Sequence, residues 1–216
     1  MLISEKLPYF SPKPLIFPCT SPQSPLGSWT LLNETTLLAS SLCSSPFAQG
    51  EVHFQESMIP PSRAYLKLWE ALMKIGQMPK AGDVCLEVGA SPGSWTWVLQ
   101  QLGASVTAVD RAKLEPSISS LPNVTFMKKD AFSLGPKDFP KLDWIFSDVI
   151  CYPEKLLSWL RQWLDIQADV NFVCTLKFQG EGGLEVVKEF EKIAGSHVTH
   201  LFHNKHELTW FKIKTS

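Results

Sequence analysis

Long hydrophobic runs, paired cysteines and a surplus of positive charge are all scarce in this chain of 216 residues. No apolar stretch approaches the ~20 residues that a membrane-spanning helix needs. The N-terminal MLISEKLPYFSPKP is interrupted by charges and prolines, which excludes a secretory signal peptide. The five cysteines form no CxxC pair, so neither a zinc site nor a disulfide framework is predicted. These absences favour a reduced, cytoplasmic protein with no membrane segment and no metal site.

The balance of charge bears on the kind of partner. The 20 Lys and Arg residues are matched by 21 Asp and Glu residues, which leaves a net charge of −1. Nucleic-acid-binding proteins usually carry a basic face, so this balance predicts that the chain alone holds RNA weakly. Apolar residues make up 44% of the chain and charged residues 19%, which indicates a globular protein with a buried core.

The chain divides near residue 58. Residues 1–58 begin with a Pro/Ser-rich arm and continue with short apolar runs that could form a hairpin or cover a sheet edge. From residue 59 to 216, apolar strands alternate with helical segments. This pattern predicts an α/β domain with a mostly parallel, seven-stranded sheet and helices on both faces. Only a short link joins the last two strands, so the C-terminal strand is predicted to be antiparallel.

The segment LEVGASPGSW is predicted to lead from a strand into a helix through a turn at Gly89 and Gly93. Glycines let the backbone approach a ligand, and the start of a helix offers free N–H groups. The spacing is not the GxGxxG of dinucleotide enzymes, and no phosphate-binding lysine follows. The alternative is that both glycines serve only packing and bind no ligand.

Two acids downstream of the turn strengthen the prediction of a nucleoside ligand. Asp110 ends the next strand, where a carboxylate can bind both hydroxyls of a ribose, and Asp130 ends the third strand beside Ala131, where it can contact an adenine edge. A ribose and an adenine without a phosphate site indicate S-adenosyl-L-methionine (SAM). The predicted cofactor-binding residues are Glu87, Gly89, Ser91, Pro92, Gly93, Ser94, Trp95, Asp110, Asp130, Ala131 and Asp148.

Four further charged residues lie at the ends of predicted elements: Lys67, Asp148, Lys177 and Glu207. Residues beyond the C-terminal ends of parallel strands meet at one crevice, so these four are expected to gather there. Two cations and two carboxylates, with one lysine available as a base, could position a hydroxyl group and remove its proton. The alternative is four unrelated surface charges, although Lys177 follows the apolar run FVCTL, where a lysine is costly without a partner.

From about residue 60 onward the chain resembles the FtsJ-like ribose 2′-O-methyltransferases, and most closely the RlmM-like branch that methylates a cytidine of bacterial 23S ribosomal RNA. The matching pieces are PSRAYLKL, EVGASPGSWTWVL, SDVICYPEKLLSWLRQWL, LKF and HELTW, and SSPFAQGEVHF resembles the connector between domains in that branch. The resemblance implies a Rossmann-like methyltransferase fold and SAM as the methyl donor. Two positions depart from the family pattern, because Glu87 replaces an aspartate and Ser94 replaces a glycine.

The resemblance also implies that Lys67, Asp148, Lys177 and Glu207 form a catalytic tetrad. We expect Lys177 to accept the proton of the ribose 2′-OH, because the nearby Lys67 cation favours a neutral amine there. Asp148 would orient Lys177 and face the sulfonium, and Glu207 would hold Lys177 or the hydroxyl. Arg63, one helical turn before Lys67, is the first candidate for contact with RNA.

The predicted function is therefore SAM-dependent 2′-O-methylation of RNA, with ribosomal RNA as the substrate. RlmM-like enzymes carry a sizeable N-terminal RNA-binding domain, for which residues 1–58 are too few, so a protein or domain partner would supply RNA affinity. The alternatives are a SAM methyltransferase with another acceptor (an mRNA cap, a small molecule or a protein) and a silent derivative that binds RNA or a partner without turnover.

Overall fold

The computed structural model describes residues 13–167, 169–178 and 183–214, and the chain forms two compact units, Met1–Glu56 and Ser57–Ser216. In the first unit, strands β1 (Ser28–Asn33) and β2 (Thr36–Ser40) pair as an antiparallel hairpin, and the short helix η2 (Ala48–Gly50) follows. The apolar runs thus form a hairpin, and every residue of both strands is exposed. The first twelve residues of the predicted arm lie outside the described residues.

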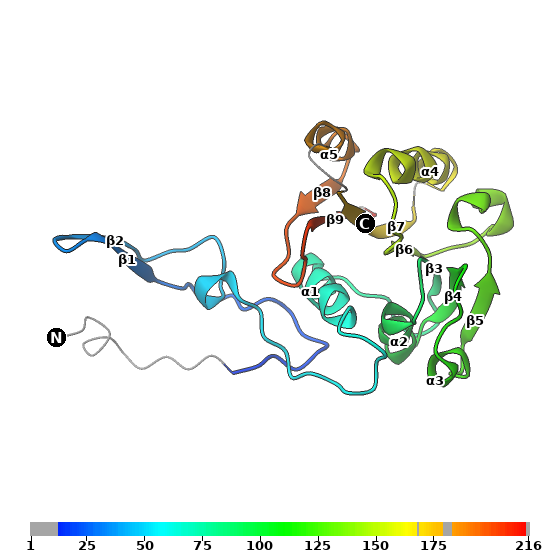
Figure 1. The fold of residues 1–216 in the computed structure, drawn as a ribbon, viewed down its shortest axis with the longest axis horizontal. Coiled ribbons are helices and arrows are strands. Elements are labelled where there is room, and N and C mark those ends of the chain that lie inside the picture. Colours follow the sequence, from blue (N-terminus) through cyan, green and yellow to red (C-terminus); the bar gives the residue numbers. More distant parts are fainter. Residues whose placement is uncertain (1–12, 168, 179–182, 215–216) are drawn as a thin grey trace. The chain divides into compact units, whose positions relative to one another are not determined.

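The second unit is built on a seven-stranded sheet with the strand order β5-β4-β3-β6-β7-β9-β8 (Figure 1). Its members are β3 (Val84–Val88), β4 (Ser105–Asp110), β5 (Val124–Lys128), β6 (Trp144–Ser147), β7 (Asn171–Lys177), β8 (Ser196–Thr199) and β9 (Glu207–Lys212). The pairs among β3 to β7 are parallel, and β9 runs antiparallel to both of its neighbours. The predicted sheet and its antiparallel last strand are confirmed.

Helices cover both faces of this sheet, as the alternation of elements predicts. The helices are α1 (Tyr65–Ile75), α2 (Ser94–Gln101), α3 (Pro116–Ser119), α4 (Pro153–Ile166) and α5 (Leu184–Glu191), with short turns η3 (Ala131–Ser133) and η4 (Pro136–Asp138). The step from β3 to β4 and the step from β6 to β7 run in opposite directions along the sheet. Right-handed crossovers therefore place α2 and α4 on opposite faces, as Figure 1 shows.

Helix α1 is unusual because it buries charge as well as apolar residues. It ends at Gly76, whose left-handed conformation (φ 75°) lets its N–H cap the carbonyl of Leu72. Its buried residues include Lys67 and Glu70, which are 6% and 5% exposed. Burying an ionised side chain is costly unless it is paired, so both residues require partners from elsewhere in the fold.

Candidate active site

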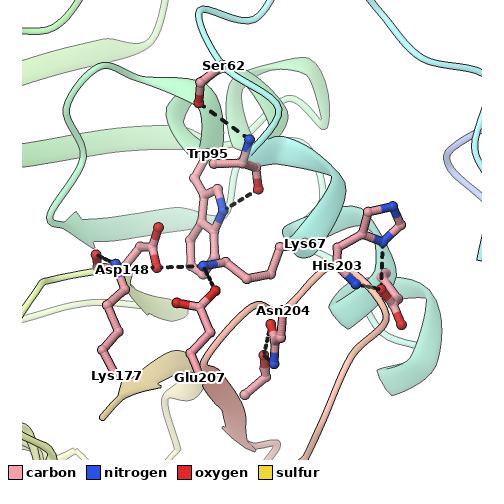
Figure 2. Close-up of polar contacts among 11 residues, drawn as sticks. Ser62, Lys67, Trp95, Asp148, Lys177, His203, Asn204 and Glu207 are labelled. Atoms are coloured by element: carbon pink, nitrogen blue, oxygen red, sulfur yellow. Dashed lines mark hydrogen bonds and ion pairs between the residues drawn. The ribbon is translucent and has the colours of Figure 1, made fainter. Parts of the chain in front are cut away.

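The four predicted catalytic residues meet at one edge of the sheet (Figure 2). Lys67 Nζ donates to Asp148 Oδ1 at 2.8 Å and to Glu207 Oε1 at 2.7 Å. Lys177 Nζ donates to the backbone oxygen of Asp148 at 2.6 Å and lies 3.0 Å from Asp148 Oδ1. The contacts thus run in one line, Lys177 to Asp148 to Lys67 to Glu207.

Strand register explains why residues so far apart in the sequence meet. Strands β6 and β7 are parallel neighbours, so Asp148 directly after β6 and Lys177 at the end of β7 emerge at the same edge. Strand β9 runs the other way and pairs Glu207 with Lys177, so the first residue of β9 reaches that edge too. Lys67 arrives from the first turn of α1.

The sequence leaves the partner of Glu207 open between Lys177 and the substrate hydroxyl. The Glu207 carboxylate accepts a hydrogen bond from Lys67, and a contact with the hydroxyl stays a prediction. Among the described residues, Lys177 instead bonds to Asp148 through both the side chain and the backbone. Asp148 therefore joins the two lysines, and Glu207 acts on the far side of Lys67.

The two lysines decide the charge state of Asp148. Burial alone would raise the pKa of this carboxyl, but Lys67 and Lys177, through charge and hydrogen bonds, lower the pKa below its ordinary value. The carboxylate is consequently ionised at neutral pH and can only accept hydrogen bonds.

A cavity of about 400 Å³ opens beside these residues, within the range of small-molecule sites. The predicted residues that line it are Gly89, Ser91, Pro92, Asp110, Asp130, Ala131, Asp148 and Lys177. The sequence analysis missed Ala64, Val109, Arg111, Lys129, Phe132, Val149 and Ile150. Several of these were within reach of the same argument, because Arg111 and Lys129 directly adjoin the two predicted strand-end acids.

The two acids of the cavity also shape its walls. Asp110 accepts hydrogen bonds from the backbone N–H of Ser91 at 3.0 Å and of Ala112 at 2.8 Å. Asp130 accepts from the backbone N–H of Phe132 at 2.9 Å. Because each carboxylate offers about four acceptor positions, both retain capacity for the hydroxyls or amino group of a ligand.

Gly89 is the point at which the glycine turn touches the tetrad. Its φ of +76° suits glycine, and a Cβ there would lie 2.6 Å from the backbone nitrogen of Val149, the residue after Asp148. Any other residue would therefore push Asp148 away. Gly93 also has a positive φ, and a Cβ there would lie 2.8 Å from the side chain of Ile118. Packing is thus part of the reason for both glycines, and Gly89 in addition lines the cavity.

Four of the predicted cofactor residues do not line this cavity: Glu87, Gly93, Ser94 and Trp95. Glu87 is buried in β3, where it accepts a hydrogen bond from Thr96 Oγ1 at 2.6 Å. Ser94 Oγ donates to the backbone oxygen of Ser62 at 3.0 Å. The hydrogen bonds of Glu87 and Ser94 thus stabilise the elements around the cavity and leave its lining to other residues.

Trp95 links the glycine turn to α1. Its Nε1 donates to the backbone oxygen of Ala64 at 2.9 Å, and its ring lies 5.6 Å from Lys67 Nζ. Trp95 therefore serves core packing and also offers Lys67 a cation–π contact. Arg63, the candidate for RNA contact, is exposed in the segment that precedes α1.

Two other kinds of site are absent from the described residues. No helix there is long and apolar enough to cross a membrane, and no cluster of three or more His, Cys, Asp or Glu could hold a metal ion. A second cavity of about 570 Å³ lies in the first unit. Its lining is rich in prolines and includes none of the predicted site residues.

Known proteins resemble the chain in sequence and in fold. It is 32% identical to the ribosomal RNA large subunit methyltransferase M of Halorhodospira halophila over 69% of this chain and 46% of that protein, so it spans about half of that relative's length. A solved structure named as a hemolysin from Lactococcus lactis matches with a TM-score of 0.57, 23% identity and coverage of 72% of this chain and 89% of that chain.

Fibrillarin, a pre-rRNA processing protein from Methanococcus jannaschii, matches with a TM-score of 0.51, 20% identity and coverage of 68% and 74%. Likeness at these identities shows the fold alone. The model of one family, described as FtsJ-like methyltransferase, matches residues 60–215, which is well over half of the chain. The chain therefore belongs to the FtsJ-like family of SAM-dependent methyltransferases.

Proposed function

We propose that this chain transfers a methyl group from SAM to a ribose 2′-hydroxyl of ribosomal RNA. One observation carries the proposal: the hydrogen-bonded line from Lys177 through Asp148 to Lys67 and Glu207 opens onto a ligand-sized cavity. The relative named as a ribosomal RNA large subunit methyltransferase supports the choice of substrate.

The residues around the cavity fit SAM. Gly89 lines the cavity without a side chain, Asp110 can accept the ribose hydroxyls, and Asp130 can accept from an adenine amino group. Asp148 belongs to the tetrad and also lines the cavity, so its carboxylate would face a positive sulfonium there. SAM would supply a methyl group that is already activated by its positive sulfur, so the chain needs to orient the hydroxyl and remove its proton.

Lys177 is the proposed proton acceptor. A neutral amine has two hydrogens and one lone pair. Two oxygens of Asp148 lie beside Lys177 Nζ, the backbone oxygen at 2.6 Å and Oδ1 at 3.0 Å, and they can accept both hydrogens. The lone pair then remains for the 2′-OH. With SAM bound, the 2′-oxygen would take the methyl group as the methyl–sulfur bond breaks and leaves its electron pair on the sulfur. The hydroxyl proton would move to Lys177 Nζ, and Asp148 would hold the ammonium that results.

Charge within the tetrad favours this sequence of events. With Lys177 neutral, the Lys67 cation and the carboxylates of Asp148 and Glu207 sum to −1, which attracts the positive donor. Proton uptake by Lys177 brings the sum to zero. The hydrogen bonds from Lys67 to the other two residues keep both carboxylates in place throughout.

RNA affinity is proposed to come partly from a protein or domain partner. The net charge of −1 provides no overall basic footprint, and phosphate contacts dominate RNA binding. Arg63 is the proposed local contact, since it is exposed one turn before Lys67. Arg63→Ala should weaken RNA binding without changing the affinity for SAM.

The test uses purified protein, SAM with a labelled methyl group and unmodified large-subunit ribosomal RNA. Alkali cleaves RNA through the 2′-hydroxyl, so a 2′-O-methyl group leaves a resistant, labelled dinucleotide. We expect label in that dinucleotide, its loss with Lys177→Ala, and its retention with Lys192→Ala, a matched change at a lysine that is 70% exposed. Label released as mononucleotide, or SAM bound with no RNA labelled, would contradict the proposal.

A further inference from the structure

Glu70 is a second buried charge on α1 that the proposed reaction does not use. It lies three residues after Lys67, so the two side chains emerge on the same side of the helix. Its carboxylate accepts hydrogen bonds from the backbone N–H of Phe202 at 2.8 Å and of His203 at 3.0 Å. The ring of His203 adds a third, from Nδ1 at 2.6 Å, because an ionised carboxylate can only accept (Figure 2).

These three donors belong to residues 200–206, the loop that joins β8 to β9. A second set of hydrogen bonds, made by Asn204, holds the part of this loop that leads into β9. Asn204 is buried, its backbone N–H donates to the oxygen of Leu201 at 3.1 Å, and its side chain bonds to Thr209 Oγ1 at 3.2 Å. Glu207 lies between Asn204 and Thr209 in the sequence, so the bond between these two side chains spans the start of β9.

Helix α1 therefore contacts both Glu207 and the loop that precedes it. Lys67 donates a hydrogen bond to the carboxylate of Glu207, and one turn later Glu70 accepts a hydrogen bond from the backbone of that loop. A buried carboxylate with three donors, one of them from a histidine, makes a strong local constraint. A core position would be filled more cheaply by an apolar residue, so simple packing does not explain Glu70.

We propose that Glu70 and His203 are positioning residues that fix Glu207 against Lys67 by anchoring the loop 200–206 to α1. The proposal rests on the proposed function for its consequence in catalysis, while the anchoring itself belongs to the protein alone. Neither residue lines the cavity. Their loss should therefore lower turnover and leave SAM binding unchanged.

The anchoring is tested first by hydrogen exchange on the whole protein without RNA. Glu70→Gln keeps the shape of the side chain but turns one acceptor oxygen into an NH₂ group that faces donors. We expect exchange in the peptide that covers residues 200–207 to quicken by about tenfold, with no change in α2. His200→Ala, at an exposed position of the same loop, is the control that should leave exchange as it is. Unchanged exchange in Glu70→Gln would overturn the proposal.

Kinetics then separate positioning from general damage. Glu70→Gln and His203→Ala should each lower kcat by about tenfold while the Kd for SAM stays within about twofold. His203→Asn should restore most of the loss, because the amide nitrogen of asparagine can donate from the place of Nδ1. In a Glu207→Gln background, Glu70→Gln should lower kcat by less than about a further twofold, since both changes remove the same effect.

The result that overturns the positioning role is a loss that multiplies in the Glu207→Gln background, or a His203→Asn variant no better than His203→Ala. Failure of the proposed function would look different. If the wild-type protein labels no RNA, the exchange experiment still decides whether Glu70 anchors the loop, because it needs neither substrate nor turnover.

Discussion

Two carboxylates on adjacent strands show how partners, rather than burial, set the chemistry of this site. Glu87 lies inside β3 and Asp148 directly follows β6, its parallel neighbour. Burial raises the pKa of Glu87 to about 8, and the hydrogen bond from Thr96 offsets only part of that rise. Burial acts on Asp148 in the same direction, but Lys67 and Lys177 overcome it and lower its pKa. One carboxyl is thus held as an acid and the other as an anion.

The difference separates a supporting region from a reacting region. A neutral Glu87 costs little to bury and can bond Thr96 in the first turn of α2, which steadies the glycine turn. Asp148 stays charged at the cavity wall, where it can act on both lysines and on a cationic ligand.

Removing the charge of Asp148 should have the largest effect on stability. Asp148→Asn leaves Lys67 and Lys177 facing each other without their shared anion, so the free energy of unfolding should fall by about 3 kcal/mol. Urea denaturation at neutral pH measures the change, and Asp165→Asn on the exposed side of α4 is the control.

The pH dependence of that loss has a definite sign. A folded pKa below the ordinary value means that the contribution of Asp148 is complete above its ordinary pKa of 3.8 and disappears as the pH falls through the folded value. A stability difference between Asp148→Asn and wild type that persisted unchanged far below that value would contradict the pairing.

Glu87 should give the opposite slope. Its folded pKa of about 8 lies above its ordinary value of 4.5, so the native state binds more protons than the unfolded state between the two. Stability should fall as the pH rises through that window, by at most about 1.4 kcal/mol per pH unit. In Glu87→Gln this contribution is absent. The measurement is the free energy of unfolding of both proteins across the window, and parallel curves would refute the shift.

A substitution at Asp110 should affect SAM binding separately from the reaction. Asp110→Asn removes a charged acceptor from the proposed ribose site, and a hydrogen bond to a charged group is worth about 1.5–3 kcal/mol. The Kd for SAM should therefore rise roughly 10- to 100-fold, which calorimetry can measure. At saturating SAM the methyl-transfer rate should stay near the wild-type value, and a large drop there would show that Asp110 acts in the reaction.

Thr96 should give the smallest effect. Thr96→Val keeps the shape of the side chain but removes the hydrogen bond that lowers the pKa of Glu87. The loss of one hydrogen bond should cost about 1 kcal/mol, and the upper end of the Glu87 slope should move to higher pH. If the upper end of the Glu87 slope moved to lower pH instead, Thr96 would raise the pKa of Glu87 rather than lower it.

Most of the sheet and the meeting of the tetrad could be predicted from the sequence, because both depend on local patterns. Asp148 and Lys177 close apolar strands, and parallel strands bring such residues to one edge. Glu207 reaches that edge because β9 lies between β7 and β8, in the antiparallel sense that the short link to β8 predicts. The division of the chain at residue 58 stays a prediction.

Side-chain partners could not be predicted in the same way. The pairing of Glu207 with Lys67 joins residues 140 positions apart, and it depends on where α1 packs. The burial of Glu70 was not predicted, although its place three residues after the predicted tetrad lysine was a usable signal. The bond between Glu87 and Thr96 likewise depends on how α2 settles on β3.

The most direct test of this account is single-turnover methyl transfer to ribosomal RNA at saturating SAM by wild type and Asp148→Asn. The product is counted as the alkali-resistant dinucleotide. We predict that the wild type forms it and that Asp148→Asn does so about a thousandfold more slowly, because the variant lacks the carboxylate charge that would hold the base Lys177 and face the sulfonium. Transfer by the variant within tenfold of the wild type would contradict the role given to the tetrad.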